Sequence, residues 1–242
     1  MSGLVDWWWM TRTRDLIRVE ADHHLTVIVR LHDRQGWAPV VRAFGAFAES
    51  LAGAGLPGQV TFASYNEHPG RYGYGDALEA VERVFATDTS AAIAQLQVAR
   101  SNGISSQAVA AASMTHLAAA FAPDPATGYR ALLARLPRGS GPVDRALATH
   151  VHQFADPTDG YRAVRELPDG SALAEAWSDR DTALADYHRA VSEQREADNV
   201  LRSLLHEHHR RAVIIDTEVE RDTCRLARAA AMRRLALVGA VR

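Results

Sequence analysis

The sequence has little that would support disulfide bonds, secretion or insertion into a membrane. A single cysteine, Cys224, in 242 residues excludes an internal disulfide and a metal site built from several cysteines. Its helical surroundings, rich in Ala and Arg, favour a structural or surface thiol over a nucleophile. The first residues lack a basic stretch followed by an apolar one, so no secretory signal is expected. No uncharged apolar run approaches the length of a membrane span.

The charge is also close to balanced, which limits the partners that the chain is expected to bind. The formal net charge is -2, whereas a protein that holds nucleic acid by general electrostatic attraction carries an excess of positive charge. Hydrophobic residues make up 47% and charged residues 23%, as in an ordinary globular protein. We therefore expect a cytoplasmic protein that binds neither nucleic acid nor a membrane.

The periodicity of apolar residues changes near residue 75, and this change predicts an α+β fold. Strands are expected at residues 4–13, 15–21, 24–31 and 58–65, in a mostly antiparallel sheet, with a helix over 36–52. Helices then follow at 76–86, from 90 onward, and at 105–121, 129–136, 143–154, 172–192, 197–211 and 217–238. No linker separates the sheet-rich part (1–75) from the helical part (76–242), so we expect a single domain over 1–242 with one core.

Three consecutive tryptophans dominate the first expected strand. Side chains alternate between the two faces of a strand, so Trp8 must point away from the face that Trp7 and Trp9 share. The same region carries Arg12 and Arg14, with Arg18 in the next expected strand. Two interpretations follow: the indoles belong to the core, or one face lines a groove in which aromatic and Arg side chains bind a ligand.

Residues 64–75, SYNEHPGRYGYG, gather phenols, a carboxylate and a guanidinium in a segment with one Pro and three Gly. Such segments form turns that expose their polar side chains. The chemically useful groups are Tyr65, Glu67, Arg71 and Tyr72. The alternative interpretation is a polar turn between sheet and helix, with Arg71 paired to Glu67 and Tyr72 in the core.

A second polar stretch lies on the helix expected at 197–211. Residues three and four apart share a helix face, which aligns Ser203 with His206 and Glu207 with Arg211. Histidine titrates near neutral pH and serves as a general acid or base. A zinc-protease helix would need a second His at position 210, which is Arg, so no metal site is predicted. A polar helix face with ion pairs is the alternative.

These stretches resemble parts of the C-terminal domains of lantibiotic dehydratases. Residues 7–15, WWWMTRTRD, are similar to the family's Trp-Phe-Phe-Ile-Arg-Tyr-Arg-Asp strand, and residues 64–73 to its Thr-Tyr-x-x-Glu-x-x-Arg-Tyr-Gly-Gly. Residues 76–89 resemble the helix that follows there. Residues 203–211, SLLHEHHRR, resemble the family's Ser-Leu-x-His-Met-x-x-Asn-Arg. The resemblance extends from Trp7 to about Leu235.

The resemblance implies modification of ribosomally made peptides. In full-length enzymes an N-terminal domain glutamylates Ser and Thr from glutamyl-tRNA, and the C-terminal domain eliminates glutamate to leave dehydroamino acids. This chain has no room for the glutamylation domain, so we expect a stand-alone homologue. Stand-alone homologues in thiopeptide pathways either eliminate glutamate or join two dehydroalanines by a formal aza-cycloaddition. The second reaction forms a central pyridine and releases the leader peptide.

One departure from the family pattern favours cycloaddition. Eliminating domains carry His-Leu-Arg-Leu-Arg on an inner strand, and those arginines bind the leaving glutamate. The matching residues 24–28 read HLTVI, with Thr26 and Ile28 in place of the arginines. The other register, residues 16–20 (LIRVE), keeps one arginine and has Glu20 in place of the other. Each lost charge-assisted contact costs roughly 2–3 kcal/mol of binding. We therefore expect a pyridine synthase; the alternatives are glutamate elimination and a non-catalytic scaffold that binds the precursor peptide.

The resemblance and the chemistry together assign roles to individual residues. His206 moves protons, Arg71 polarises an amide oxygen, and Ser203 adds a hydrogen bond. Tyr65 and Tyr72 donate hydrogen bonds, while Glu67 orients Arg71 or acts as a base. The residues expected to bind substrate are Trp7, Trp9, Arg12, Arg14 and Arg18. The expected partner is a dehydrated, azole-containing precursor peptide with its leader, together with other enzymes of the pathway, and the reaction needs no cofactor.

Overall fold

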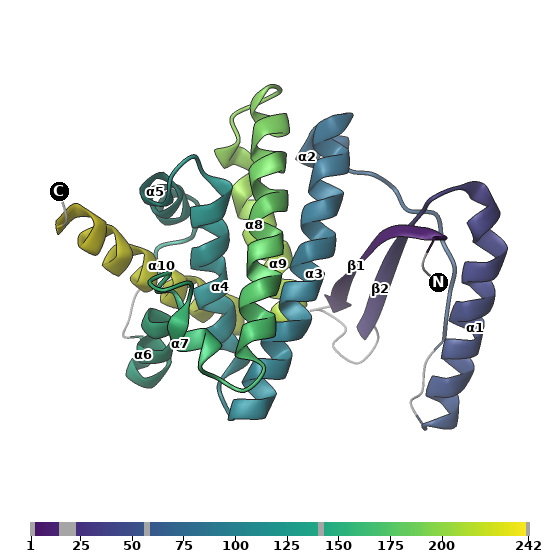
Figure 1. Cartoon of the computed structure of the whole chain (residues 1–242), viewed down its shortest axis with the longest axis horizontal. Coiled ribbons are helices and arrows are strands. Elements are labelled where there is room, and N and C mark those ends of the chain that lie inside the picture. The colour runs from purple at the N-terminus through teal and green to yellow at the C-terminus, as the bar shows by residue number, and fades with distance from the viewer. Residues whose placement is uncertain (1–2, 15–22, 56–58, 140–142, 241–242) are drawn as a thin grey trace.

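The computed structural model describes residues 3–14, 23–55, 59–139 and 143–240, and these residues form the expected α+β fold (Figure 1). A two-stranded antiparallel sheet comes first and a bundle of helices follows. The elements are β1 (Val5–Arg14), β2 (His23–Leu31), the 3₁₀ helix η1 (Arg34–Gly36), α1 (Trp37–Gly53), α2 (Pro69–Tyr72), α3 (Asp76–Asn102), α4 (Ser106–Phe121), α5 (Pro125–Arg135), α6 (Arg145–Phe154), α7 (Arg162–Arg165), α8 (Gly170–Ser192), α9 (Asp198–Ala212) and α10 (Thr217–Ala240). None of the described helices is long and apolar enough to cross a bilayer.

The alternation predicted for the tryptophans is present in β1. Trp9 is only 3% exposed and joins the core of the helical bundle, with Trp7 packed beside it, whereas Trp8 points the other way and is 43% exposed. Trp9 lies opposite Ile28 of β2, and that pair faces the helices. The sheet thus covers one side of the bundle through a single apolar face, as expected for a half-buried antiparallel sheet.

The helices pack around α4, whose alanine-rich sequence is buried on nearly every side. A helix that is apolar all round belongs in the middle of a bundle, because no face of it suits water. Gly128 allows α5 to approach closely, since a Cβ at this position would lie 2.1 Å from the carbonyl oxygen of Ala118. The helices expected at 105–121, 143–154, 172–192, 197–211 and 217–238 appear as α4, α6, α8, α9 and α10, within two residues at each end.

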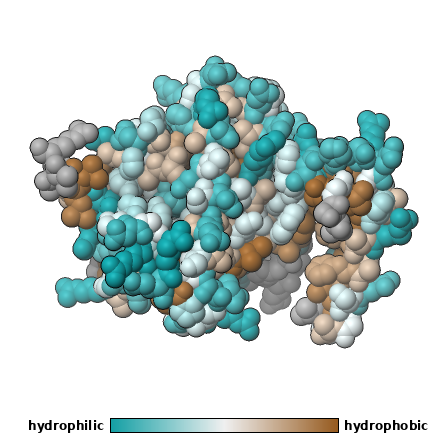
Figure 2. Space-filling model, viewed as in Figure 1, coloured by the Kyte–Doolittle hydropathy of each residue, from teal (hydrophilic) through white to brown (hydrophobic). Residues whose placement is uncertain are grey.

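Helix α1 lies beside the sheet, away from the helical bundle (Figure 1). Its bounds match the helix expected at 36–52. Large apolar side chains are exposed on and near α1, and Figure 2 shows apolar patches on this side of the molecule as well as elsewhere. They include Trp37, Phe47 and, in the segment after α1, Val60 and Phe62.

Two expectations about secondary structure are wrong. No strand forms over the described residues 59–65, which run extended and exposed. The free edge of β1 offers them no partner, because Thr89, Arg210 and Arg211 already bind its backbone at Met10 and Arg12. The strand expected over residues 15–21 lies outside the described residues, and Arg18 with it.

The break expected at residues 87–90 is also absent, and α3 continues through it for 27 residues. Thr, Asp and Ser favour helix ends because their side chains compete for backbone hydrogen bonds. Here tertiary partners satisfy them instead. Thr89 donates to the carbonyl of Phe85 within the helix and accepts from the backbone N–H of Met10, and Asp88 binds side chains of α8 and α9.

Arginines join β1 to the end of α9 in both directions. Arg210 donates to the carbonyl oxygen of Arg12 and Arg211 to that of Met10. In return, Arg12 donates to the carbonyls of Arg210 and Val213, near the last turn of α9. The last carbonyls of a helix lack partners within it, so the guanidinium of Arg12 closes the C-terminus of α9, while Arg210 and Arg211 fix α9 against the sheet.

Candidate functional site

The short helix α2 presents Arg71, and glycines with unusual backbone angles set its position. Pro69 begins α2, and the chain then turns through Gly73 and Gly75, both with positive φ. A side chain at Gly73 would meet the Oε1 atom of Gln194 at 2.8 Å. Gln194, two residues after α8, accepts from the N–H of Tyr74 and donates to its carbonyl oxygen. These two hydrogen bonds fix the turn that follows α2.

Arg71 reaches across to α9. Its Nε donates to the hydroxyl of Ser203 at 2.9 Å, and its Nη1 lies 3.7 Å from a carboxylate oxygen of Glu207. The pairing with Glu67 that sequence allowed is not made. Glu207 also binds Arg210 at 3.3 Å, whereas Arg211, its expected partner, binds Asp88.

Arg71, Ser203 and His206 line one cavity of about 540 Å³, which brings together side chains 132 positions apart in sequence. The walls come from α2, α4, α9, α10 and the chain after α5. The remaining lining residues are Met114, Leu136, Pro137, Arg138, Gly139, Arg202, Thr217, Glu220, Arg221 and Cys224. The predicted alignment of Ser203 with His206 on one face of α9 is confirmed, because both side chains reach this cavity.

His206 is held by Glu220 of α10, with 2.6 Å between Nδ1 and the carboxylate. The hydrogen bond with His206 lowers the pKa of Glu220, and the resulting carboxylate can only accept. Nδ1 is therefore the donor, and a neutral imidazole keeps its acceptor lone pair on Nε2. Both side chains are partly exposed. The arrangement suits a general base whose ring is oriented by a carboxylate.

Cys224 lines the same cavity but is not suited to act as a nucleophile. Burial raises the pKa of its thiol to about 12. The thiol is therefore protonated at neutral pH, and thiols attack as thiolates. Its side chain serves as a small apolar part of the wall, in keeping with the structural thiol expected from sequence.

The other predicted catalytic side chains lie outside the cavity lining. Tyr72 is buried in the core, edge-on to Phe85, with the guanidinium of Arg71 above its ring. Tyr65 packs edge-on against Trp9, and burial raises the pKa of its phenol to about 12. Tyr72 thus supports the guanidinium of Arg71, Tyr65 lies against Trp9, and both phenols are protonated at neutral pH. Glu67 is exposed.

The side chains predicted to bind substrate are largely engaged within the protein. Trp9 lies in the core, and Trp7 packs beneath the guanidiniums of Arg30 and Arg83. Arg12 closes the end of α9, as described above. Arg14 donates to the carbonyl of Ile215 at 3.1 Å, and Arg18 lies outside the described residues. The exposed indole of this strand is Trp8.

Sequence reasoning missed Glu220 and the arginines around the cavity. Glu220 lies 14 residues after His206 on a separate helix, so helical spacing carries no signal for the pair. Arg138 follows α5, and it lines the same cavity as Arg202 only because the bundle packs these elements together. The two helices are visible in the sequence, but their relative rotation, which places Glu220 against His206, is not.

Beneath the site, α3, α8 and α9 share a buried charged cluster centred on Asp88. Its carboxylate binds Arg180 at 2.9 Å, Arg211 at 3.0 Å and Nδ1 of His208 at 2.7 Å, and these four side chains are at most 2% exposed. Burial alone would raise the pKa of Asp88, but the three partners together hold it well below its usual range. The cluster fixes the rotation of α9, and therefore the direction in which His206 points.

His209 makes stability depend on pH. Its side chain is buried, and Nε2 has no hydrogen-bond partner within the described residues, so burial lowers its pKa from 6.5 to about 4. Between pH 6.5 and about pH 4, His209 is protonated in the unfolded state but neutral in the folded state. This contribution to stability is therefore complete above pH 6.5 and decreases as the pH falls to about 4. We expect wild type to lose about 3 kcal/mol more than His209→Gln over this range, measured by urea unfolding. Equal losses in the two proteins would contradict this assignment.

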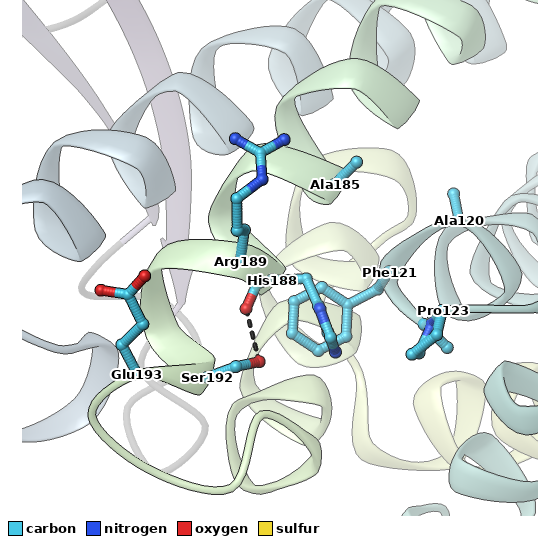
Figure 3. A pocket seen from close by; sticks show the side chains of 9 residues that line it. Ala120, Phe121, Pro123, Ala185, His188, Arg189, Ser192 and Glu193 are labelled. Atoms are coloured by element: carbon cyan, nitrogen blue, oxygen red, sulfur yellow. Dashed lines mark hydrogen bonds between the residues drawn. The ribbon is translucent and has the colours of Figure 1, made fainter.

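A second hollow, of about 600 Å³, lies between the end of α4 and α8 (Figure 3). His188 stands edge-on to Phe121 there, and Ser192 donates to the carbonyl of His188. None of the residues that sequence reasoning selected lines this hollow. The His206 cavity is therefore the candidate site.

Comparison with known proteins agrees with this choice of fold and family. The family model described as "Lantibiotic biosynthesis dehydratase C-term" matches residues 2–231. The chain is also similar to the tRNA-dependent lantibiotic dehydratase MibB from Microbispora sp. 107891, with 26% identity and a TM-score of 0.81. That match covers 96% of this chain and 25% of MibB. No curated protein matches the chain. The chain belongs to the family of lantibiotic dehydratase C-terminal domains.

Proposed function

We propose that this protein modifies a ribosomally made precursor peptide, joining two of its dehydroalanines by a formal aza-cycloaddition. The product is a pyridine within a macrocycle, and water and the leader peptide are lost. Membership of the dehydratase family supports a peptide-modifying reaction. The chain spans a quarter of the length of MibB.

The observation that carries the choice of reaction is the sequence of β2 at Thr26 and Ile28. In the register that matches residues 24–28 to the family's His-Leu-Arg-Leu-Arg, Thr26 and Ile28 take the place of the glutamate-binding arginines; the other register, residues 16–20, lies outside the described residues. Thr26 lies opposite Thr11, whose hydroxyl approaches Glu207 at 3.4 Å, and Glu207 is the carboxylate beside Arg71. Ile28 packs against the core. At these two positions β2 therefore carries no guanidinium, and its Arg30 is paired with Glu82 at 3.1 Å. This supports a substrate without a glutamyl leaving group.

The cavity provides what the first step of the cycloaddition requires. One peptide amide must transfer a proton from nitrogen to oxygen, which gives an iminol and an azadiene. Nε2 of His206 removes the proton from nitrogen, and Arg71 with Ser203 stabilises charge on the amide oxygen. Glu220 keeps the imidazole oriented. Behind Arg71, Tyr72 packs beneath its guanidinium and holds it in place, and Tyr65 is proposed to donate a further hydrogen bond.

Ring formation and aromatisation follow. Two carbon–carbon bonds form between the azadiene and the second dehydroalanine, and holding these groups together supplies much of the rate. The hydroxyl from the former amide then leaves as water, and the leader leaves as its amide, which gives the aromatic ring. His206 passes the proton from the amide nitrogen to the amide oxygen, and it then moves the two protons lost from the ring CH2 groups to the departing hydroxyl and to the departing leader amide. Whether β1 also contacts the leader through its aromatic and Arg side chains stays a prediction.

A second candidate function, elimination of glutamate from glutamylated Ser or Thr, is favoured by one observation. Four guanidiniums line the cavity, those of Arg71, Arg138, Arg202 and Arg221. Such a cavity suits a carboxylate, and a base at His206 would equally remove the α-proton in an elimination. The two reactions differ in their substrates, so they are separated by experiment.

The purified protein should convert a dehydrated, azole-containing precursor peptide. We expect mass spectrometry to show the leader as a separate amide and a core peptide that has also lost water. A new aromatic absorbance should appear with the same time course. Binding without a change of mass would support the non-catalytic scaffold instead.

A further inference from the structure

The His206 cavity has an excess of positive charge that the proposed proton transfers do not use. Its lining contains four arginines and one carboxylate, and that carboxylate, Glu220, is already bound to His206 at 2.6 Å. A cavity with this balance attracts anions and repels cations.

Two of the four arginines have partners elsewhere. Arg71 binds Ser203 and lies near Glu207, and Arg221 pairs with Glu218 at 2.7 Å. Within the described residues, Arg138 and Arg202 form neither a hydrogen bond nor an ion pair. Both are exposed, so they lie where the cavity meets solvent.

The two unpaired guanidiniums reach one cavity from separate elements. Arg202 is on α9, one residue before Ser203, and Arg138 is on the chain that leaves α5. A guanidinium offers a fork of N–H donors that matches the two oxygens of a carboxylate. An anion bound between them would relieve the repulsion of like charges and would lie beside the apolar wall formed by Leu136 and Pro137.

We propose that Arg138 and Arg202 form a binding site for a carboxylate carried by the peptide substrate, at the rim of the His206 cavity. The proposal rests on the proposed function, because it assumes a peptide in this cavity. Under the proposed function the carboxylate comes from an acidic side chain of the leader; a glutamyl group on Ser or Thr, which the elimination reaction would supply, is the other source that the test separates. Either would anchor the peptide while its reacting atoms lie near His206.

The test measures binding of fluorescently labelled precursor peptide by anisotropy, to wild type and to the Arg138→Gln/Arg202→Gln double variant. We expect the double variant to bind about 10- to 100-fold more weakly. Salt should weaken binding to wild type more than binding to the variant. Arg189→Gln, on the rim of the other hollow, is the matched control and should bind as wild type does.

Two further peptides identify the source of the carboxylate. If the leader supplies it, a leader with Gln and Asn in place of its acidic residues should bind wild type as weakly as the natural leader binds the double variant. If a glutamyl group supplies it, glutamylation should strengthen binding to wild type only. The proposal is overturned if the double variant binds every peptide as tightly as wild type, or if wild type binds none. A peptide bound through these arginines but never converted would reject the proposed reaction and leave this site intact.

Discussion

Asp88→Asn is expected to lower the free energy of unfolding by about 3–5 kcal/mol. The substitution keeps the shape of the side chain but removes the charge that Arg180 and Arg211 share in the core. Two guanidiniums that are at most 2% exposed would then lack a counter-ion. Chemical denaturation followed by circular dichroism measures the loss.

The matched control is Glu79→Gln on the same helix. Glu79 pairs with Arg83 at 2.9 Å, but both side chains are about half exposed, so its loss should cost less than about 1 kcal/mol. The double variant Asp88→Asn/Arg180→Met should lose less free energy of unfolding than the sum of the two single variants. The reason is that Arg180→Met removes a buried charge that Asp88→Asn leaves without a counter-ion. Equal costs for Asp88→Asn and Glu79→Gln would show that the cluster does not hold the helices together.

His206→Gln is expected to slow product formation by about 10²- to 10⁴-fold, the usual contribution of a general acid or base. The imidazole side chain is 42% exposed, so folding should be unaffected. Glu220→Gln removes the charge-assisted hydrogen bond that orients the ring and should lower kcat by about 10- to 100-fold. Its KM should stay unchanged, because Glu220 acts through His206. The rate of leader release measures both effects.

His188→Gln is the matched control for His206, because His188 lines the second hollow. It should retain the activity of wild type. Unfolding curves for all three variants would show that they are folded. If His206→Gln forms product at the rate of wild type, His206 is not the base, and Ser203 and Arg71 would lose their assigned roles with it.

The helices and the family were predictable because the patterns that indicate them lie within short stretches of sequence. Apolar spacing located α4, α6, α8, α9 and α10, and the alternation of side chains in β1 separated Trp8 from Trp9. Ser203 and His206 were found because three-residue spacing on a helix is independent of tertiary packing. Short motifs around Arg71 and His206 were sufficient to indicate the family.

The errors came where tertiary partners override local preference. Asp88 and Thr89 predicted a break in the helix. Inside the bundle, however, residues distant in sequence form an ion pair with Asp88 and a hydrogen bond with Thr89. The segment 59–65 has the composition of a strand, yet the edge of β1 is already bound by arginines of α9. The contact between Arg12 and the end of α9 was likewise not foreseen, and its expected role in substrate binding stays a prediction. Such pairings depend on how the helices rotate against one another, which periodicity does not specify.

One competition assay tests the central claim most directly. Equal amounts of a dehydrated, azole-containing precursor and of its glutamylated counterpart are incubated with the protein in one tube, and mass spectrometry follows both. The proposed function predicts that the dehydrated peptide loses water and its leader, while the glutamylated peptide keeps its mass. Loss of glutamate from the glutamylated peptide, with the dehydrated peptide unchanged, would contradict it.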